Sequence, residues 1–93
     1  MKYEDTNIWI ASALASQGVG CKAEKIGTLK SGKGKYLFIF EADTPESEKI
    51  IKDTLEKYHR SELLIDVKTL EDNYKVLKNH INRIQKSIDK YGE

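Results

Sequence analysis

The chain has little cysteine and no long apolar run. These two features argue against a disulfide-stabilised protein and against a membrane-spanning protein. Cys21 is the single cysteine among 93 residues, so no disulfide can form within the chain. A protein without disulfides is typical of the reducing cytoplasm. Apolar stretches such as residues 37–40 and 63–65 are far too short to span a bilayer. Residues 1–17 lack the basic start and apolar centre of a signal peptide. We therefore expect a cytoplasmic protein that does not enter a membrane.

The chain is short, and its charge is unevenly distributed. With 93 residues it can form one core, so we expect a single domain, with a compact part over 1–79 and a helical extension over 80–93.

Residues 22–35 hold five lysines and one glutamate, and residues 75–90 hold five basic residues and one aspartate. Each segment has a balance of +4, which leaves −7 for the remainder of a chain whose total is +1. Such segregation can present a basic surface to an anionic partner.

The first half of the sequence predicts a helix followed by a β-hairpin. Asp5 or Thr6 is expected to cap the helix, which ends at Gly18 because glycine tolerates a left-handed turn. Residues 21–29 and 35–42 are expected to form two strands, joined by a glycine-rich turn. The second strand is apolar on both faces, which indicates a central strand covered by helices.

The second half predicts two more helices. Thr44 is the expected cap of the first, with Pro45 at its first position, and Asp66 is the expected cap of the second. Residues 63–65 can add a short third strand. The predicted fold is α+β, in the order α-β-β-α-(β)-α, with a small antiparallel sheet covered by helices. Its expected core consists of Leu14, Tyr36, Phe38, Ile39, Phe40, Ile51, Leu55, Leu70 and Leu77.

Apolar residues in the last third of the chain alternate at steps of three and four, which is a heptad seam. The seam comprises Val67, Leu70, Tyr74, Leu77, Ile81, Ile84, Ile88 and Tyr91. A small domain can cover the first half of this stripe, whereas Ile81, Ile84, Ile88 and Tyr91 would lie in water without a partner. We therefore expect a homodimer along this helix. In the competing interpretation, the helix folds back across the sheet and buries the stripe within one chain.

Trp9 is the second candidate interface residue. It falls off the apolar arc of the first helix, beside Ser12 and Ser16. A tryptophan in such a place is either half-covered by neighbouring chain, here residues 1–3, or an anchor for a protein partner. The sequence leaves both interpretations open.

No catalytic or metal-binding pattern is evident. Residues 27–33 match most of a phosphate-binding P-loop, but Gly34 stands where the magnesium ligand must be serine or threonine. A strand is expected to follow, whereas a P-loop needs a helix N-terminus. Cys21 with His59 or His80 can be imagined as nucleophile and base, but a lone cysteine is usually a small buried apolar residue. We expect no enzyme activity, no cofactor and no metal.

The lysine-rich hairpin is the strongest candidate binding site. Lysines around a glycine turn can contact a nucleic-acid backbone, and Tyr36 can stack on a base. The alternative is that the lysines protect a sheet edge against aggregation. The predicted phosphate contacts are Lys22, Lys25, Lys30, Lys33, Lys35 and Arg83.

Residues 7–14, Gly18, residues 38–41 and a few later positions form a pattern that spans about residues 3–79. The later positions are Tyr58, Val67, Leu77 and Lys78. The pattern resembles a small domain family of unknown function that occurs in bacteria, their phages and mobile elements. Asn7 departs from it, since the family usually has an acid there, and the final helix continues past the family's usual end. The resemblance implies an accessory protein of a mobile element.

Two functional hypotheses follow from these observations. The first is a non-enzymatic accessory or regulatory protein that binds nucleic acid through the lysine-rich hairpin. The second is a protein-interaction module, such as a phage-borne inhibitor or adaptor, that engages a host protein through Trp9 and the final helix.

Overall fold

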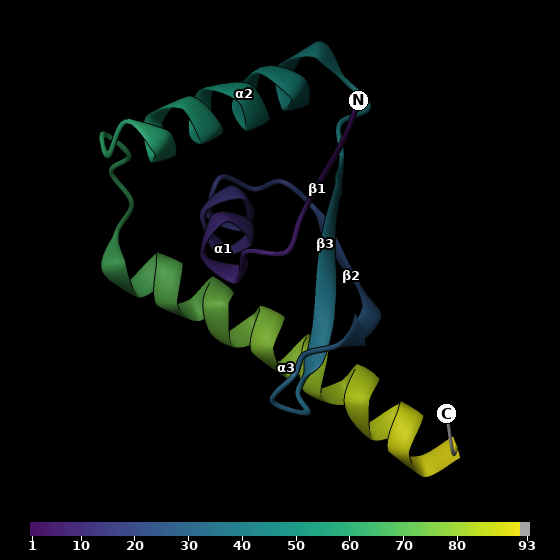
Figure 1. Ribbon diagram of the computed structural model, residues 1–93. Helices are drawn as coiled ribbons and strands as arrows, with labels where there is room; N and C mark the ends of the chain where they lie inside the picture. The colour runs from purple at the N-terminus through teal and green to yellow at the C-terminus, as the bar shows by residue number, and fades with distance from the viewer. Residues whose placement is uncertain (92–93) are drawn as a thin grey trace.

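The computed structural model describes the backbone of residues 1–91 and the side chains of residues 1–88. These residues form a three-stranded antiparallel sheet and three helices (Figure 1). The elements are β1 (Lys2–Asp5), α1 (Ile8–Ser16), β2 (Cys21–Thr28), β3 (Gly34–Glu41), α2 (Pro45–His59) and α3 (Val67–Tyr91). The predicted α+β class, the antiparallel sheet and the long final helix are confirmed.

The sheet has the order β1-β3-β2, so β3 is its central strand, as its apolar sequence predicts. Phe40 pairs with Tyr3 of β1 on one side and with Cys21 of β2 on the other. The third strand is therefore β1, and the expected strand at residues 63–65 does not form. The segment at 63–65 follows α2 on the far side of α1 from the sheet, so it cannot reach a strand edge (Figure 1).

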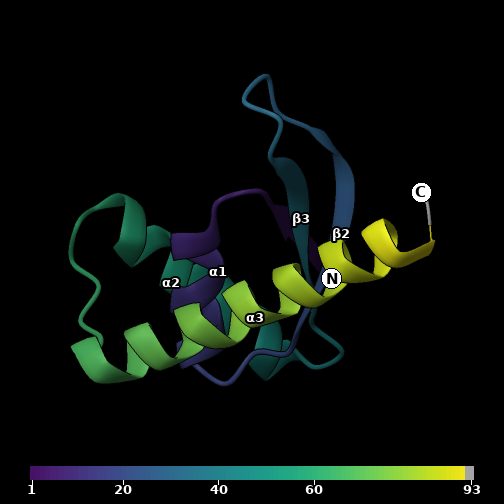
Figure 2. The ribbon, with the colours of Figure 1, turned by 90° about the horizontal axis from the view of Figure 1, so that it is seen from below.

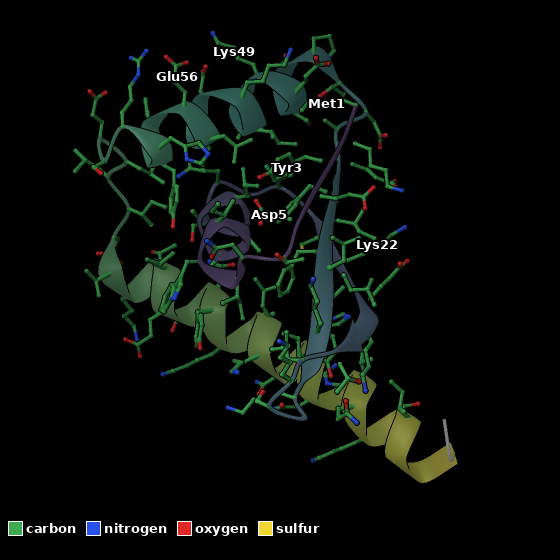
Figure 3. All side chains as sticks on the ribbon, viewed as in Figure 1. Met1, Tyr3, Asp5, Lys22, Lys49 and Glu56 are labelled. Carbon is green, nitrogen blue, oxygen red and sulfur yellow. The ribbon has the colours of Figure 1, made fainter. Side chains whose placement is uncertain are left out.

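The helices gather on one face of the sheet. Figures 1 and 2 show α1 and α2 on one side, with α3 running across the end of the sheet nearest the hairpin turn. Side chains alternate between the two faces of a strand. Phe38 and Phe40 therefore face the helices, and Ile39 faces the opposite side. Lys22, which pairs with Ile39, points away from the helices (Figure 3).

The core lies between this face of the sheet and the helices. Phe38, Phe40, Leu14, Ile51 and Ser12 are its largest fully buried residues. Of the other predicted core residues, Ile39 and Leu77 are buried, whereas Tyr36, Leu55 and Leu70 are only partly buried. The prediction missed Ser12, whose hydroxyl donates a hydrogen bond to the carbonyl of Ile8 at 2.7 Å and so satisfies its polar group inside the core.

The cap of α1 differs from the prediction. Asn7 is the N-cap, and its side-chain oxygen accepts hydrogen bonds from the backbone N–H groups of Trp9 (2.9 Å) and Ile10 (3.4 Å). Asp5 cannot take this role because it belongs to β1, and its carboxylate accepts from the N–H of Asn7 at 2.8 Å. The predicted caps of α2 and α3, Thr44 and Asp66, are confirmed by bonds of 3.1 Å from Ser47 N and Thr69 N.

The apolar seam of α3 is partly covered within one chain. Leu77 is buried and Ile81 packs against the core, while Ile84 and Ile88 are half-buried. The premise that Ile81, Ile84 and Ile88 lie in water without a partner is therefore wrong, because each is partly covered by its own chain. The side chain of Tyr91 lies outside the described residues.

We expect Phe38→Ala and Phe40→Ala each to lower the free energy of unfolding by about 3–5 kcal/mol, because each removes a fully buried ring. Urea denaturation of the purified variants measures this loss. Leu37→Ala, on the opposite face of β3 and only partly buried, is the control and should cost much less. An unchanged melting temperature in both phenylalanine variants would contradict this account of the core.

Candidate functional site

The hairpin that joins β2 and β3 has a short, well-defined turn. Leu29 N donates to Lys33 O at 2.7 Å, and Gly32 N donates to Leu29 O at 2.9 Å. Gly32 has φ +87°, in the left-handed region that favours glycine. The P-loop-like run at 27–33 therefore leads through a turn into a strand, and no helix N-terminus follows it.

A groove of about 640 Å³ lies between this hairpin, the start of α1 and the second half of α3. Figure 2 shows the turn of the hairpin projecting away from α3. The polar and charged residues that line the groove on the hairpin and on α3 are Lys33, Lys35, Tyr36, Lys78, Asn82 and Gln85. Residues from both basic segments thus line one common groove, although the alternation of β3 places Lys35 on the same strand face as Leu37 and Ile39.

The floor of the groove is apolar. Ile8, Leu29, Phe38 and Ile81 line it from four different elements or turns. Phe38 is buried in the core, whereas Leu29 is 47% exposed at the hairpin turn. The groove therefore combines an apolar surface with a cationic rim.

A hydrogen-bond network connects the hairpin to α3 at this groove. Gln85 Oε1 accepts from Lys25 Nζ at 2.9 Å and from Tyr36 Oη at 3.0 Å. The Tyr36 ring also lies against Gly34, where a Cβ atom would come within 2.7 Å of the tyrosine oxygen. Glycine at position 34 is therefore what allows Tyr36 to reach Gln85.

The electrostatics of the groove favour an anion. Its lining, among the residues that the structure describes, includes no carboxylate. The ion pairs found over the same residues engage Lys2, Lys52, Arg60 and Lys75. Lys33, Lys35 and Lys78 take part in none of these pairs, so their charges are not neutralised locally by them.

The structure brings only part of the predicted nucleic-acid site together. Lys33 and Lys35 line the groove, and Lys25 lies beside it in its bond to Gln85. Lys22 is on the opposite face of the sheet (Figure 3). Lys30 is exposed in the turn and Arg83 is exposed on α3, and neither lines the groove.

Sequence reasoning missed three groove residues on α3, namely Lys78, Asn82 and Gln85. Together with Ile81 they are spaced three or four residues apart, so they share one helix face. The signal that could have identified these residues is their helical spacing within the basic segment at 75–90, which predicts a polar, cationic helix face.

Trp9 is half-covered, but by a different neighbour from the one expected. Its ring stacks on Tyr74 of α3, with centroids 4.5 Å apart and an interplanar angle of 15°, and it remains 50% exposed. Together with Leu63, Ile65 and Leu70 it lines a second hollow of about 500 Å³. This hollow lies between α1, the α2–α3 connection and α3.

The cysteine and the histidines are not arranged as a reactive site. Burial raises the pKa of the Cys21 thiol to about 11, so the thiol stays protonated at neutral pH. Cys21 packs against the core, and His59 and His80 are exposed. Within the described part of the chain, no three His, Cys, Asp or Glu side chains gather into a possible metal site.

Comparisons with protein families, with curated proteins and with solved structures find no match to this chain. The family resemblance inferred from core positions therefore stays a hypothesis. Over the described residues, no helix is both long and apolar enough to cross a membrane.

We expect Gly34→Ala to lower the free energy of unfolding by about 1–3 kcal/mol, because the new methyl group displaces Tyr36 and breaks its bond to Gln85. Urea denaturation measures the loss. Gly27→Ala is the matched control in the same hairpin, since its Cβ would meet no atom within 4 Å. Equal stabilities of the two variants would show that the contact between Gly34 and Tyr36 does not constrain the hairpin.

Proposed function

We propose that the protein is a non-enzymatic, nucleic-acid-binding accessory or regulatory protein, and that the groove between the hairpin and α3 is its binding site. One observation carries this proposal. Two basic segments that are far apart in the sequence contribute Lys33, Lys35 and Lys78 to one groove, whose described lining holds no carboxylate. A phosphate backbone is a polyanion that can meet lysines on both sides of a groove.

The number of lysines predicts the salt dependence of binding. Neutralising phosphates releases bound counterions, so the logarithm of the binding constant falls linearly with the logarithm of salt concentration. Three phosphate contacts correspond to a slope of roughly −2 for a single strand and roughly −3 for a duplex. If the lysines only protect a sheet edge, salt-dependent binding is not expected.

We expect labelled oligonucleotides to bind with such a slope, measured by fluorescence anisotropy over a range of salt concentrations. The triple variant Lys33→Gln, Lys35→Gln, Lys78→Gln should bind roughly tenfold more weakly or worse at low salt, with most of the slope lost. The matched control is Lys22→Gln, Lys49→Gln, Lys57→Gln, which removes the same charge from exposed positions outside the groove. Absence of binding at low salt, or equal losses in both triple variants, would refute the proposal.

A specific observation favours a second candidate function, protein interaction. Trp9 is 50% exposed at the second hollow, which Leu63, Ile65 and Leu70 also line. Exposed large apolar residues in one area are typical of interaction surfaces, and tryptophan is enriched at binding hot spots. A host protein is one proposed partner of this surface.

The other proposed protein partner is a second copy of the chain, paired along α3. Ile84 and Ile88 keep part of their surface exposed after α3 has packed on its own domain. Burying an isoleucine fully stabilises by about 1.5–3 kcal/mol, so the remaining surface can support only a modest dimer.

Sedimentation of the chain at several concentrations tests this homodimer. We expect a concentration-dependent dimer that Ile88→Lys weakens by roughly tenfold or more, because the lysine brings a charge into the seam. Val76→Lys, at an exposed position of α3 off the seam, is the control and should leave the dimer unchanged. A monomer at all concentrations, with Ile84→Lys unfolding it, would show that the seam serves only its own domain.

A further inference from the structure

We propose that the groove takes single-stranded nucleic acid and holds one base against its apolar floor, with the adjacent phosphates on the lysine rim. This inference rests on the proposed function and names the form of nucleic acid that the same groove recognises. The groove combines two kinds of surface, an apolar floor and a cationic rim.

The apolar floor is the first part of the argument. Ile8, Leu29, Phe38 and Ile81 add nothing to the binding of a phosphate backbone, which needs only charge. A nucleobase offers a flat, weakly polar face that can leave water against the exposed parts of Ile8, Leu29 and Ile81, whereas Phe38, at 1% exposure, adds almost no contact. A volume of about 640 Å³ lies within the range of pockets that hold small organic molecules, so the groove has room for a nucleotide.

The rim is the second part. Lys33 lies in the hairpin turn and Lys78 lies on α3, so cationic residues line the groove on two sides of the floor. An anion bound on one side of the groove would contact only the lysines of that side. A phosphate backbone that passes across the groove contacts the lysines of both sides. A nucleotide within a strand has a phosphate on each side of its base and matches this arrangement.

Duplex nucleic acid does not fit this arrangement equally well. Its bases are stacked and paired, so inserting one requires unpairing at a cost in free energy. Bases of a single strand are already accessible and stack readily on protein side chains. The groove therefore favours the single strand.

Contacts within the chain hold the groove wall in place. The Tyr36 ring lies against Gly34, and its hydroxyl group is bonded to Gln85 at 3.0 Å. Lys25 holds the same oxygen of Gln85 at 2.9 Å. A wall fixed in this way loses little side-chain freedom on binding, which favours affinity.

Leu29 provides a sensitive test because it lines the groove without being buried. It is 47% exposed, and Ile26 in the same hairpin is 48% exposed but lies outside the groove. Leu29→Ala and Ile26→Ala thus form a matched pair that removes similar apolar surface inside and outside the proposed site. Neither substitution empties the core.

The experiment compares four probes by fluorescence anisotropy at one salt concentration. The probes are an oligothymidine, an abasic oligonucleotide of equal length and charge, a duplex of the same length and a polyglutamate of equal charge. We expect the oligothymidine to bind roughly tenfold more tightly than the abasic strand and more tightly than the duplex. Leu29→Ala should weaken oligothymidine binding about three- to tenfold and leave abasic binding unchanged, while Ile26→Ala should match the unsubstituted protein.

Each other outcome overturns the inference in a distinguishable way. Equal binding of the abasic and thymidine strands would refute base insertion, and the proposed function would stand if the triple lysine variant still loses affinity. Stronger binding of the duplex would refute the preference for a single strand and would indicate that the groove binds the phosphate backbone of a duplex. Polyglutamate binding as tight as oligothymidine binding would make the groove a site for acidic protein segments. No binding of any nucleic-acid probe would overturn both the inference and the proposed function.

Discussion

The packing of Phe38 and Phe40 against the helices is the interaction on which the rest of the structure depends. Both rings lie on the central strand and are fully buried. Residues of all three helices join the same cluster, with Leu14 from α1, Ile51 from α2 and Leu77 from α3. Because α3 has its apolar stripe only on one side, contact at Leu77 also determines which side of α3 faces the sheet.

The groove is a consequence of this packing. Once Leu77 is held in the core, the next turns of α3 run past the hairpin, and Gln85 comes within hydrogen-bond distance of Lys25 and Tyr36. The same placement puts Lys78 opposite the lysines of the hairpin. A basic, partly apolar groove thus arises where the hairpin meets the second half of α3. Neither segment by itself indicates a binding site strongly. Its charge and its apolar floor together favour an anionic ligand that has a flat apolar part.

Several features could be predicted from the sequence because their causes are local. The hairpin follows from two β-rich runs around glycines, and the start of α2 follows from Thr44 and Pro45. The first strand could not be predicted in this way. The segment at residues 2–5 is short and mostly polar. It forms a strand because it pairs with β3 and Tyr3 packs against Phe40, with ring centroids 6.4 Å apart. The cap of α1 moved to Asn7 for the same reason.

The candidate site was predictable only in part. Lys33 and Lys35 could be assigned because they flank a glycine turn that the sequence itself predicts. Lys22 was assigned to the same site, but the alternation of a strand turns it to the other face. Lys78 and Gln85 could not be assigned, because their role depends on how α3 is docked.

Local sequence patterns specify the class of fold, the central strand, the hairpin and the amphipathic face of α3, since these follow from periodicity and turn chemistry within short windows. Only the tertiary structure decided the partner of each surface. It brought β1 to the free edge of β3, placed Tyr74 under Trp9, and set the two basic segments on opposite sides of one groove. The physical reason is that packing in a small domain depends on long-range contacts between elements, and no local pattern specifies which two faces meet.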